Sequence, residues 1–328
     1  MEISGLLRRY PVGRFLSNRE ESSRLKQKER LDILPASWLA TVRLNSTYLE
    51  LVGKFYDGKG FLSIVMLAML LAYCGVCCAV LFVVTTRPVG YDRMLNDFFM
   101  TVVAIALFSP VIWLSFMGLR RESFRLTHYP IRLNRKLRKV YAFEPYDLKI
   151  VEADWDQMVF TLSPCSNSAM RITQYEILGH VLDEKGVIRV TLPFSIVTAN
   201  KDAVRAHWEY MRRYMEYGPS AIFDHTPVCL PIADQRETLL LSYQMTLIDD
   251  SFPIWIVIAG VLLIPEALGR YFAMRTSKIP QWPEAIEEAC RIEADDPFAI
   301  DARNNPEKFW GSTEKRRSEL VASGAIAR

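Results

Sequence analysis

The sequence is poor in the residues and motifs from which most catalytic and metal sites are built. Only four histidines occur in 328 residues, and they lie far apart along the chain. It contains no nucleophile elbow, no glycine-rich phosphate loop and no His-x-x-x-His pair. Convergence of the scattered histidines in the folded chain is the open alternative. We therefore predict that the chain is not an enzyme and carries neither a metal nor another cofactor.

The six cysteines do not form a disulfide framework. Cys74, Cys77 and Cys78 lie within one apolar stretch, and the other three are scattered singly. The spacing of Cys74 and Cys77 resembles a redox or zinc motif, but no second Cys or His pair accompanies it. We interpret these cysteines as small packing residues, typical of a reducing compartment or of a bilayer interior.

Strong net charge is also absent, and we expect no secretory leader in residues 1–60. The formal net charge is only +3, which does not by itself indicate nucleic-acid binding. Residues 1–60 are polar and basic, without the short apolar core and cleavage site of a signal peptide. Hydrophobic residues, in contrast, make up half of the chain, and the mean hydropathy is +0.07. This apolar excess predicts segments embedded in a membrane.

Two long apolar runs carry most of that excess. Phe61–Thr85 and Phe98–Leu119 contain no charged residue, and Pro110 predicts a kink in the second run. At a rise of about 1.5 Å per residue, each run can cross the roughly 30 Å hydrocarbon layer of a membrane. We predict a transmembrane hairpin over residues 61–119, with a short link between the two helices.

Lysine and arginine predict the orientation of this hairpin. Basic residues are frequent before the first run and after the second, whereas the link contains only Arg87 and Arg93. Because cytoplasmic flanks carry an excess of Lys and Arg, both flanks should be cytoplasmic and the link should face outward. The expected location is the bacterial inner membrane, with several crossings and the main domain in the cytoplasm.

Residues 120–219 have the pattern of a cytoplasmic α+β domain. A hairpin loop is expected at Asp183–Gly186, and a single helix at Lys201–Tyr217, capped by Asn200 and stopped at Gly218. An antiparallel sheet closed by one helix is the order of a pleckstrin-homology-like barrel, and also of other small α+β domains. The alternating stretches read as strands are Thr127–Leu133, Lys139–Phe143, Lys149–Thr161 and Ile188–Phe194.

The remaining segments complete the expected domain plan. Residues 1–60 form a basic cytoplasmic leader, 220–251 a connector and 275–328 a polar C-terminal tail. Residues 252–274 are expected to form a third membrane segment, although Pro265 and Glu266 interrupt its apolar run. An acid is costly at depth in a membrane, so a re-entrant or interface-lying segment is the alternative.

A basic stretch follows the second apolar run and is a candidate for contact with anionic lipid or with a protein partner. Juxtamembrane cations are attracted to anionic cytoplasmic lipids. Charges that only set the membrane topology would produce the same pattern, and this simpler role is the alternative. The candidate contact residues are Arg132, Arg135, Lys136, Arg138 and Lys139.

Four stretches in this order resemble a family of proteobacterial membrane proteins that contain a domain of unknown function. They are Thr127–Phe143, Gly179–Gly186, His207–Pro219 and Cys229–Glu237, and the resemblance covers roughly Tyr48 to Pro297. The family has no assigned catalytic residue, so its motif positions have no role to carry over. These positions are His128, Tyr129, Pro130, Tyr141, His180, Asp183, Trp208, Arg212 and Arg213.

The resemblance implies a function by genomic association. Members of the family are often encoded near type VI secretion genes, which implies an accessory role such as immunity to a delivered toxin. An immunity protein binds its toxin and needs no reaction centre. The expected partners are therefore the membrane, a toxin or effector protein and anionic lipid, and no nucleic acid. The alternative is a membrane-anchored scaffold or lipid-sensing module without any link to toxins.

Overall fold

The computed structural model describes residues 6, 8–86, 91–167, 172–249 and 264–305. The chain forms two compact units, each assembled from separate parts of the sequence. The first, called the sheet unit, comprises Met1–Gly58, Thr127–Glu237 and Ile279–Arg328. The second, called the helical unit, comprises Lys59–Leu126 and Thr238–Lys278.

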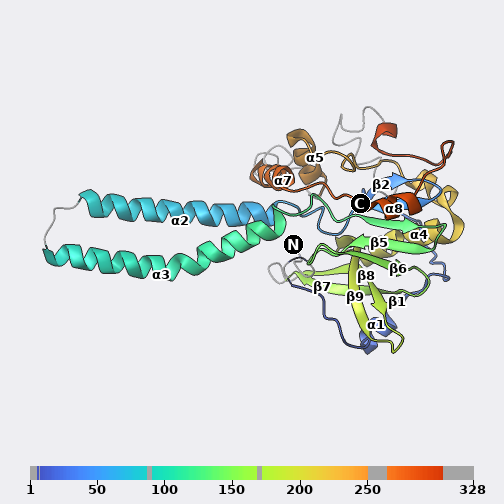
Figure 1. The fold of residues 1–328 in the computed structure, drawn as a ribbon, viewed down its shortest axis with the longest axis horizontal. Coiled ribbons are helices and arrows are strands. Elements are labelled where there is room, and N and C mark those ends of the chain that lie inside the picture. Colours follow the sequence, from blue (N-terminus) through green and yellow to red (C-terminus); the bar gives the residue numbers. More distant parts are fainter. Residues whose placement is uncertain (1–5, 7, 87–90, 168–171, 250–263, 306–328) are drawn as a thin grey trace. The chain divides into compact units, whose positions relative to one another are not determined.

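A five-stranded antiparallel sheet forms one half of the sheet unit (Figure 1). Its strands follow the order β2-β3-β4-β5-β6, and each pairs with its neighbour in the sequence. Alternation of apolar and polar residues suits such a sheet, because successive side chains point to opposite faces. The strands are β2 (Thr41–Leu44), β3 (Tyr48–Leu51), β4 (Ile131–Asn134), β5 (Lys139–Phe143) and β6 (Ile150–Asp154).

A four-stranded antiparallel sheet forms the other half, in the order β1-β7-β8-β9. The predicted turn at Asp183–Gly186 joins β8 to β9, and Gly186 adopts a φ of +79° there. Asp183 accepts hydrogen bonds from the backbone N–H groups of Lys185 and Val187, which fixes this turn. The strands are β1 (Arg24–Leu25), β7 (Val159–Asn167), β8 (Ile172–Leu182) and β9 (Ile188–Thr198).

Helix α4 (Lys201–Tyr217) has the predicted bounds and supplies aromatic residues to the core. The Asn200 side chain accepts hydrogen bonds from two N–H groups of its first turn, as expected for an N-cap. Trp208 is fully buried and stacks on Trp155 at 5.6 Å between ring centroids, while Phe160 packs against both rings. Trp208 therefore packs α4 against the aromatic core of the sheet unit.

The segment expected to be a separate basic leader instead belongs to the sheet unit. It contributes a short helix, α1 (Asn18–Ser22), and the first three strands. β3 pairs with β4 in a register that places Tyr48 opposite Asn134, although the two strands are far apart in the sequence. Residues 120–219 alone therefore lack three strands, so the α+β domain is larger than predicted. Strands of two to four residues are too short to display a clear alternation.

Part of the expected C-terminal tail also folds onto the five-stranded sheet. Helix α8 (Glu284–Ala289) brings Ile286 against Tyr48 and Tyr141 in a buried cluster. Farther along, Ile300 and Leu44 exchange both backbone hydrogen bonds, so this segment extends the sheet beyond β2. Short 3-10 turns complete the unit: η1 (Pro219–Ala221), η2 (Phe223–His225) and η3 (Ala302–Asn304).

In its described residues, the helical unit contains two long helices and two shorter ones. Helices α2 (Phe61–Thr86) and α3 (Tyr91–Glu122) lie side by side and run in opposite directions (Figure 1). Pro110 lies inside α3. The shorter helices α5 (Leu239–Asp249) and α7 (Ile264–Thr276) pack on each other, and α7 also packs on α2.

Length and composition single out one helix in the described part of the chain as able to cross a membrane. This stretch is Phe61–Val83 in α2, and it matches the first predicted span. The second predicted span, Phe98–Leu119, lies within α3, and its crossing of a membrane stays a prediction. Residues 252–263 of the third predicted segment lie outside the described residues, whereas its end forms part of α7.

Candidate functional site

Large apolar side chains point outward along α2 and α3. Apart from Ser63 near its start, no residue of Phe61–Val83 in α2 is buried. A helix that is apolar on every side is typical of a protein interior or of a membrane span, and these side chains are not in a protein interior. Leu71, Leu81, Phe82, Phe98, Phe99 and Trp113 are between 63% and 70% exposed.

The two helices touch along a narrow line. A Cβ atom added to Gly118 of α3 would lie 2.8 Å from Cγ of Met66 in α2, so the glycine allows the backbones to approach closely. Small residues play this role where membrane helices pack. Gly75, near the middle of α2, has open space around it, and Cys74 beside it is exposed. The pair therefore leaves most of its apolar surface uncovered.

A polar cluster joins the two helices at their base. The Lys59 ammonium donates hydrogen bonds to the carbonyl oxygens of Glu122, at 2.6 Å, and Leu126, at 2.7 Å. The Glu122 carboxylate accepts hydrogen bonds from the backbone N–H and the hydroxyl of Ser63, both at 2.5 Å. A cation thus lies at the C-terminus of α3 and a carboxylate at the N-terminus of α2, which is the favourable arrangement for both helix dipoles.

Arg132, the first residue of the basic stretch, is a core residue. Its guanidinium lies 2.8 Å from Glu50 and 3.0 Å from Glu287, between the rings of Tyr48 and Trp282. Burial lowers the pKa of Arg132, but the charge of Glu50 and the hydrogen bond to Glu287 outweigh it and raise the pKa. All four residues of β4 are buried, so both faces of this strand are covered and the Arg132 guanidinium faces internal acids. A contact of this residue with lipid or a partner stays a prediction.

The other cations of the stretch have acidic or backbone partners within the sheet unit. Arg138 binds Asp156 and Glu216, and its hydrogen bond lowers the pKa of Asp156. Lys136 pairs with Glu293 and Lys139 with Glu152. The Arg135 guanidinium lies beside Gly218, and its backbone N–H donates to the carbonyl oxygen of Thr47. The structure thus gives internal partners to four of the five cations through their side chains, which reduces their availability to lipid.

Four motif positions near the start of the family resemblance surround β4 and β5. His128 and Tyr129 are buried, and the His128 ring lies 3.1 Å from the Thr127 hydroxyl. The carbonyl oxygen of Pro130 accepts a hydrogen bond from the N–H of Phe143. Tyr141 belongs to the buried cluster beneath α8. All four positions are buried within the sheet unit.

His180 lies in the middle of the four-stranded sheet. Its two ring nitrogens lie 3.1 Å from the hydroxyl of Thr161 and 3.0 Å from that of Thr191, on the strands either side. Burial lowers the pKa of His180 to about 4, so the ring is neutral near pH 7. A neutral ring between two hydroxyls is a core hydrogen-bonding residue.

The motif residues of α4 form a buried ion cluster. Glu209 is fully buried and accepts hydrogen bonds from Arg212, at 2.8 Å, and from Arg213, at 2.7 Å. Burial raises the pKa of Glu209, but the hydrogen bonds from the two arginines lower it by more. The net pKa is therefore below the ordinary value of a glutamate. Arg213 also donates to the carbonyl oxygen of Ile33. The motif residues Trp208, Arg212 and Arg213 therefore fasten α4 to the sheets and to the N-terminal segment.

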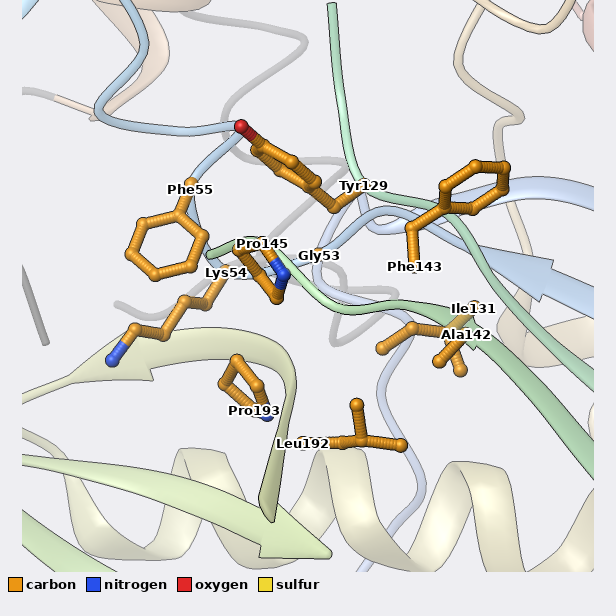
Figure 2. A pocket seen from close by; sticks show the side chains of 10 residues that line it. All are labelled: Gly53, Lys54, Phe55, Tyr129, Ile131, Ala142, Phe143, Pro145, Leu192 and Pro193. Atoms are coloured by element: carbon orange, nitrogen blue, oxygen red, sulfur yellow. The ribbon is translucent and has the colours of Figure 1, made fainter. Parts of the chain in front are cut away.

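A small cavity in the sheet unit lies beside a buried ion pair that has no local signal in the sequence (Figure 2). Lys54 forms a 2.7 Å ion pair with Glu176 and donates to the Tyr10 hydroxyl, and both charged side chains are nearly inaccessible. The cavity offers about 10 Å³, room for at most one water molecule. Its lining is mostly apolar, with Phe55, Tyr129 and Pro193 around it in Figure 2. This space does not fit a metabolite.

The described ranges contain no group of three or more His, Cys, Asp or Glu side chains arranged to hold a metal ion. The ion pairs of Glu50, Glu176 and Glu209 cannot be predicted from the sequence. The first two join segments that are distant in sequence, and the third lies on the buried side of α4. The only local signal of these pairs is an acidic residue within an otherwise apolar strand, as at Glu50. They are structural elements of the sheet unit.

The fold and the apolar surface define an α+β protein with an antiparallel pair of apolar helices. The chain belongs to a family of unknown function (DUF6708), whose model matches residues 108–294, more than half of the chain. All four motif stretches lie within this match. No curated protein and no solved structure matches the chain. The expected membership of a family of unknown function is confirmed, while proteobacterial origin and the link to type VI secretion stay predictions.

Proposed function

We propose that the chain is a non-enzymatic accessory protein of the bacterial inner membrane, anchored by α2 and α3. The observation that carries this proposal is the large exposed apolar surface along the two helices. Each square ångström of apolar surface left in water costs roughly 25 cal/mol, and contiguous patches above a few hundred Å² are typical of membrane or protein contacts. Lipid covers all sides of such a pair at once, whereas a protein partner covers one side.

The concentration of Lys and Arg supports the orientation. Arg120 and Arg121 lie in the last turn of α3, next to the base that α3 shares with the start of α2. The positive-inside rule then places this base at the cytoplasmic face and the link between the helices outside. The sheet unit, which follows α3 directly, is cytoplasmic in this arrangement.

Immunity to a toxin delivered by type VI secretion is the specific role we propose. The resemblance to a family encoded near such systems supports it, and a stoichiometric binding function requires no catalytic constellation. The alternative is a membrane-anchored scaffold or lipid-sensing module unrelated to toxins. The internal partners of Arg132, Lys136, Arg138 and Lys139 weaken lipid sensing through the basic stretch.

A competition experiment tests the immunity proposal. A strain lacking both this gene and the adjacent effector gene is co-cultured with the parent strain, which delivers the effector. We expect the double mutant to be outcompeted, and we expect restoration of this gene alone to rescue it. Equal competition while the effector is being delivered would contradict immunity and favour the scaffold.

The role of the anchor needs a variant that leaves the sheet unit intact. Removing residues 1–119 would also remove β1, β2 and β3, so loss of protection by that variant would be ambiguous. Replacing residues 61–122 with a short polar linker is cleaner, because Lys59 lies within hydrogen-bonding distance of the Glu122 carbonyl oxygen. If the toxin acts at the bilayer, this variant should accumulate as a folded protein and protect poorly. Full protection by it would show that the anchor is dispensable.

A further inference from the structure

Helix α7 presents an apolar stripe to solvent. Ile264, Leu268 and Phe272 follow one another at intervals of four residues, so they lie along one side of the helix. They are 44%, 47% and 38% exposed, whereas Ala267 and Ala273 on other sides are buried within the unit. The ring of Phe124, just after α3, packs edge-on against Phe272 at 6.4 Å between centroids and is itself exposed. The stripe thus continues onto the end of α3.

Hydrogen bonds and close packing fix α7 at the base of α2 and α3. The Thr276 hydroxyl donates to the carbonyl oxygen of Ser123 at 2.6 Å, and the Ser277 hydroxyl donates to the same oxygen at 3.0 Å. In the middle of α7, a Cβ atom on Gly269 would lie 2.7 Å from Cβ of Ile64, in the first turn of α2. α7 therefore lies where the apolar length of α2 begins and where α3 ends.

Exposed cations lie at the same level as the stripe. Arg275 is in the last turn of α7, Lys278 follows it, and Arg120 is in the last turn of α3. The backbone N–H of Lys278 donates to the carbonyl oxygen of Arg125, which keeps this side chain beside the end of α3. An apolar stripe bordered by cations is the pattern of a helix that lies in the surface of an anionic membrane.

We propose that α7 lies in the cytoplasmic headgroup layer, with its stripe in the acyl boundary and Arg275 and Lys278 on anionic phospholipid. This rests on the proposed membrane crossing of α2 and α3, and it names anionic phospholipid as the ligand of the surface at their base. The 13 residues of α7 measure about 20 Å, less than the roughly 30 Å of the hydrocarbon layer. The half-buried Glu266 within α7 also suits an interface better than the bilayer centre.

Depth measurements on the full chain in lipid vesicles test the proposal. A nitroxide amino acid is placed at Leu268, at Phe272, at Val76 in the middle of α2, or at Asn304 in the sheet unit. Accessibility to oxygen and to a water-soluble nickel complex then gives the depth of each label, with Asn304 as the control in water. We expect hydrocarbon depth at Val76 and interfacial depth at Leu268 and Phe272.

The possible results separate the two proposals. Hydrocarbon depth at Val76 with water-like values at both α7 positions would overturn the interfacial helix and leave the anchor intact. Leu268 as deep as Val76 would also overturn it, because α7 would then be part of a span. Water-like accessibility of the label at Val76 would overturn the proposal that α2 and α3 cross the membrane.

Charge variants test the lipid class. The double substitution Arg275→Gln and Lys278→Gln is compared with Arg303→Gln, which removes an exposed cation from the sheet unit. Vesicles contain phosphatidylcholine alone or with phosphatidylglycerol. With phosphatidylglycerol, we expect the double variant to move the Leu268 label toward water, and we expect no movement in R303Q. An unchanged depth in the double variant would overturn the assignment of anionic lipid.

Discussion

At the scale of single residues, three buried cations of the sheet unit are each matched by a buried carboxylate. The pairs are Lys54 with Glu176 at 2.7 Å, Arg132 with Glu50 at 2.8 Å and Arg212 with Glu209 at 2.8 Å. Removing one member of such a pair leaves an uncompensated charge in a low dielectric. These pairs join segments distant in sequence or fasten a helix, so their loss should be felt as loss of stability.

Arg132→Gln should therefore lower the free energy of unfolding by about 3–5 kcal/mol, because it leaves Glu50 buried without its partner. The matched control is Lys139→Gln on the next strand, where the partner Glu152 is exposed and the ion pair is screened by solvent. Denaturant unfolding of the detergent-solubilised chain measures both. Equal, small effects would show that Arg132 is not part of the core.

Two buried histidines predict how stability depends on pH. Burial lowers the pKa values of His180 and His207 to about 4, below the unfolded value of about 6.5. The unfolded chain then binds more protons than the folded chain, so the free energy of unfolding falls as pH falls below 6.5. Between pH 7 and pH 5, each histidine should cost about 2 kcal/mol of stability. His180→Gln, which keeps a neutral polar side chain beside Thr161 and Thr191, should reduce this fall by about half. An equal loss of stability between pH 7 and pH 5 in the wild type and in His180→Gln would contradict the lowered pKa of His180.

At the scale of elements, close backbone contact fixes α7 on α2. Gly269→Ala should weaken this crossing, because the added methyl would lie 2.7 Å from Cβ of Ile64 and 2.8 Å from the carbonyl oxygen of Gly60. The matched control is Gly75→Ala, in open space in α2. Alanine favours a helix over glycine by roughly 1 kcal/mol at both positions, so their difference isolates the crossing. We expect a lower melting temperature in detergent for G269A only. A higher melting temperature in both variants would show that the packing of α7 on α2 does not depend on the close backbone contact at Gly269.

The elements that could be predicted from sequence have strong local signals. α4 has an N-cap at Asn200, a stop at Gly218 and an aromatic face, and its predicted bounds are confirmed. The β8–β9 turn is marked by Asp183 and Gly186 in the same way. β2 and β3 have four residues each, and their place in the sheet depends on pairing with a strand about eighty residues later. Such non-local pairing has no local signature, so the sequence of residues 1–60 predicts a separate leader.

The candidate contacts show the same limit. The basic stretch of residues 132–139 is evident in the sequence, but the acids that pair with it come from β3, β6, α4 and the C-terminal segment. The sequence alone shows one cluster of positive charge, whereas the fold pairs four of its five cations with acids from other segments. The apolar helices can be predicted from the sequence, because a long run without charged residues is itself the local signal of a membrane span.

At the scale of the whole molecule, membrane topology is the property on which the other roles depend. We expect a reporter that is active only in the periplasm to work when fused after Gly90, in the link between α2 and α3. A reporter fused at Lys185, in the exposed turn between β8 and β9, should be active only in the cytoplasm. The physical reason is the excess of Lys and Arg on both sides of the helix pair and their scarcity in the link.

Labelling of a single introduced cysteine checks this orientation without a fusion. The six native cysteines are first replaced, and Lys185→Cys is compared with Gly90→Cys in intact cells, using a thiol reagent that does not cross the inner membrane. We expect labelling at position 90 only, and labelling at position 185 after the cells are lysed. Labelling at position 185 in intact cells would place the sheet unit in the periplasm. The toxin proposed as its partner would then have to be met outside the cytoplasm.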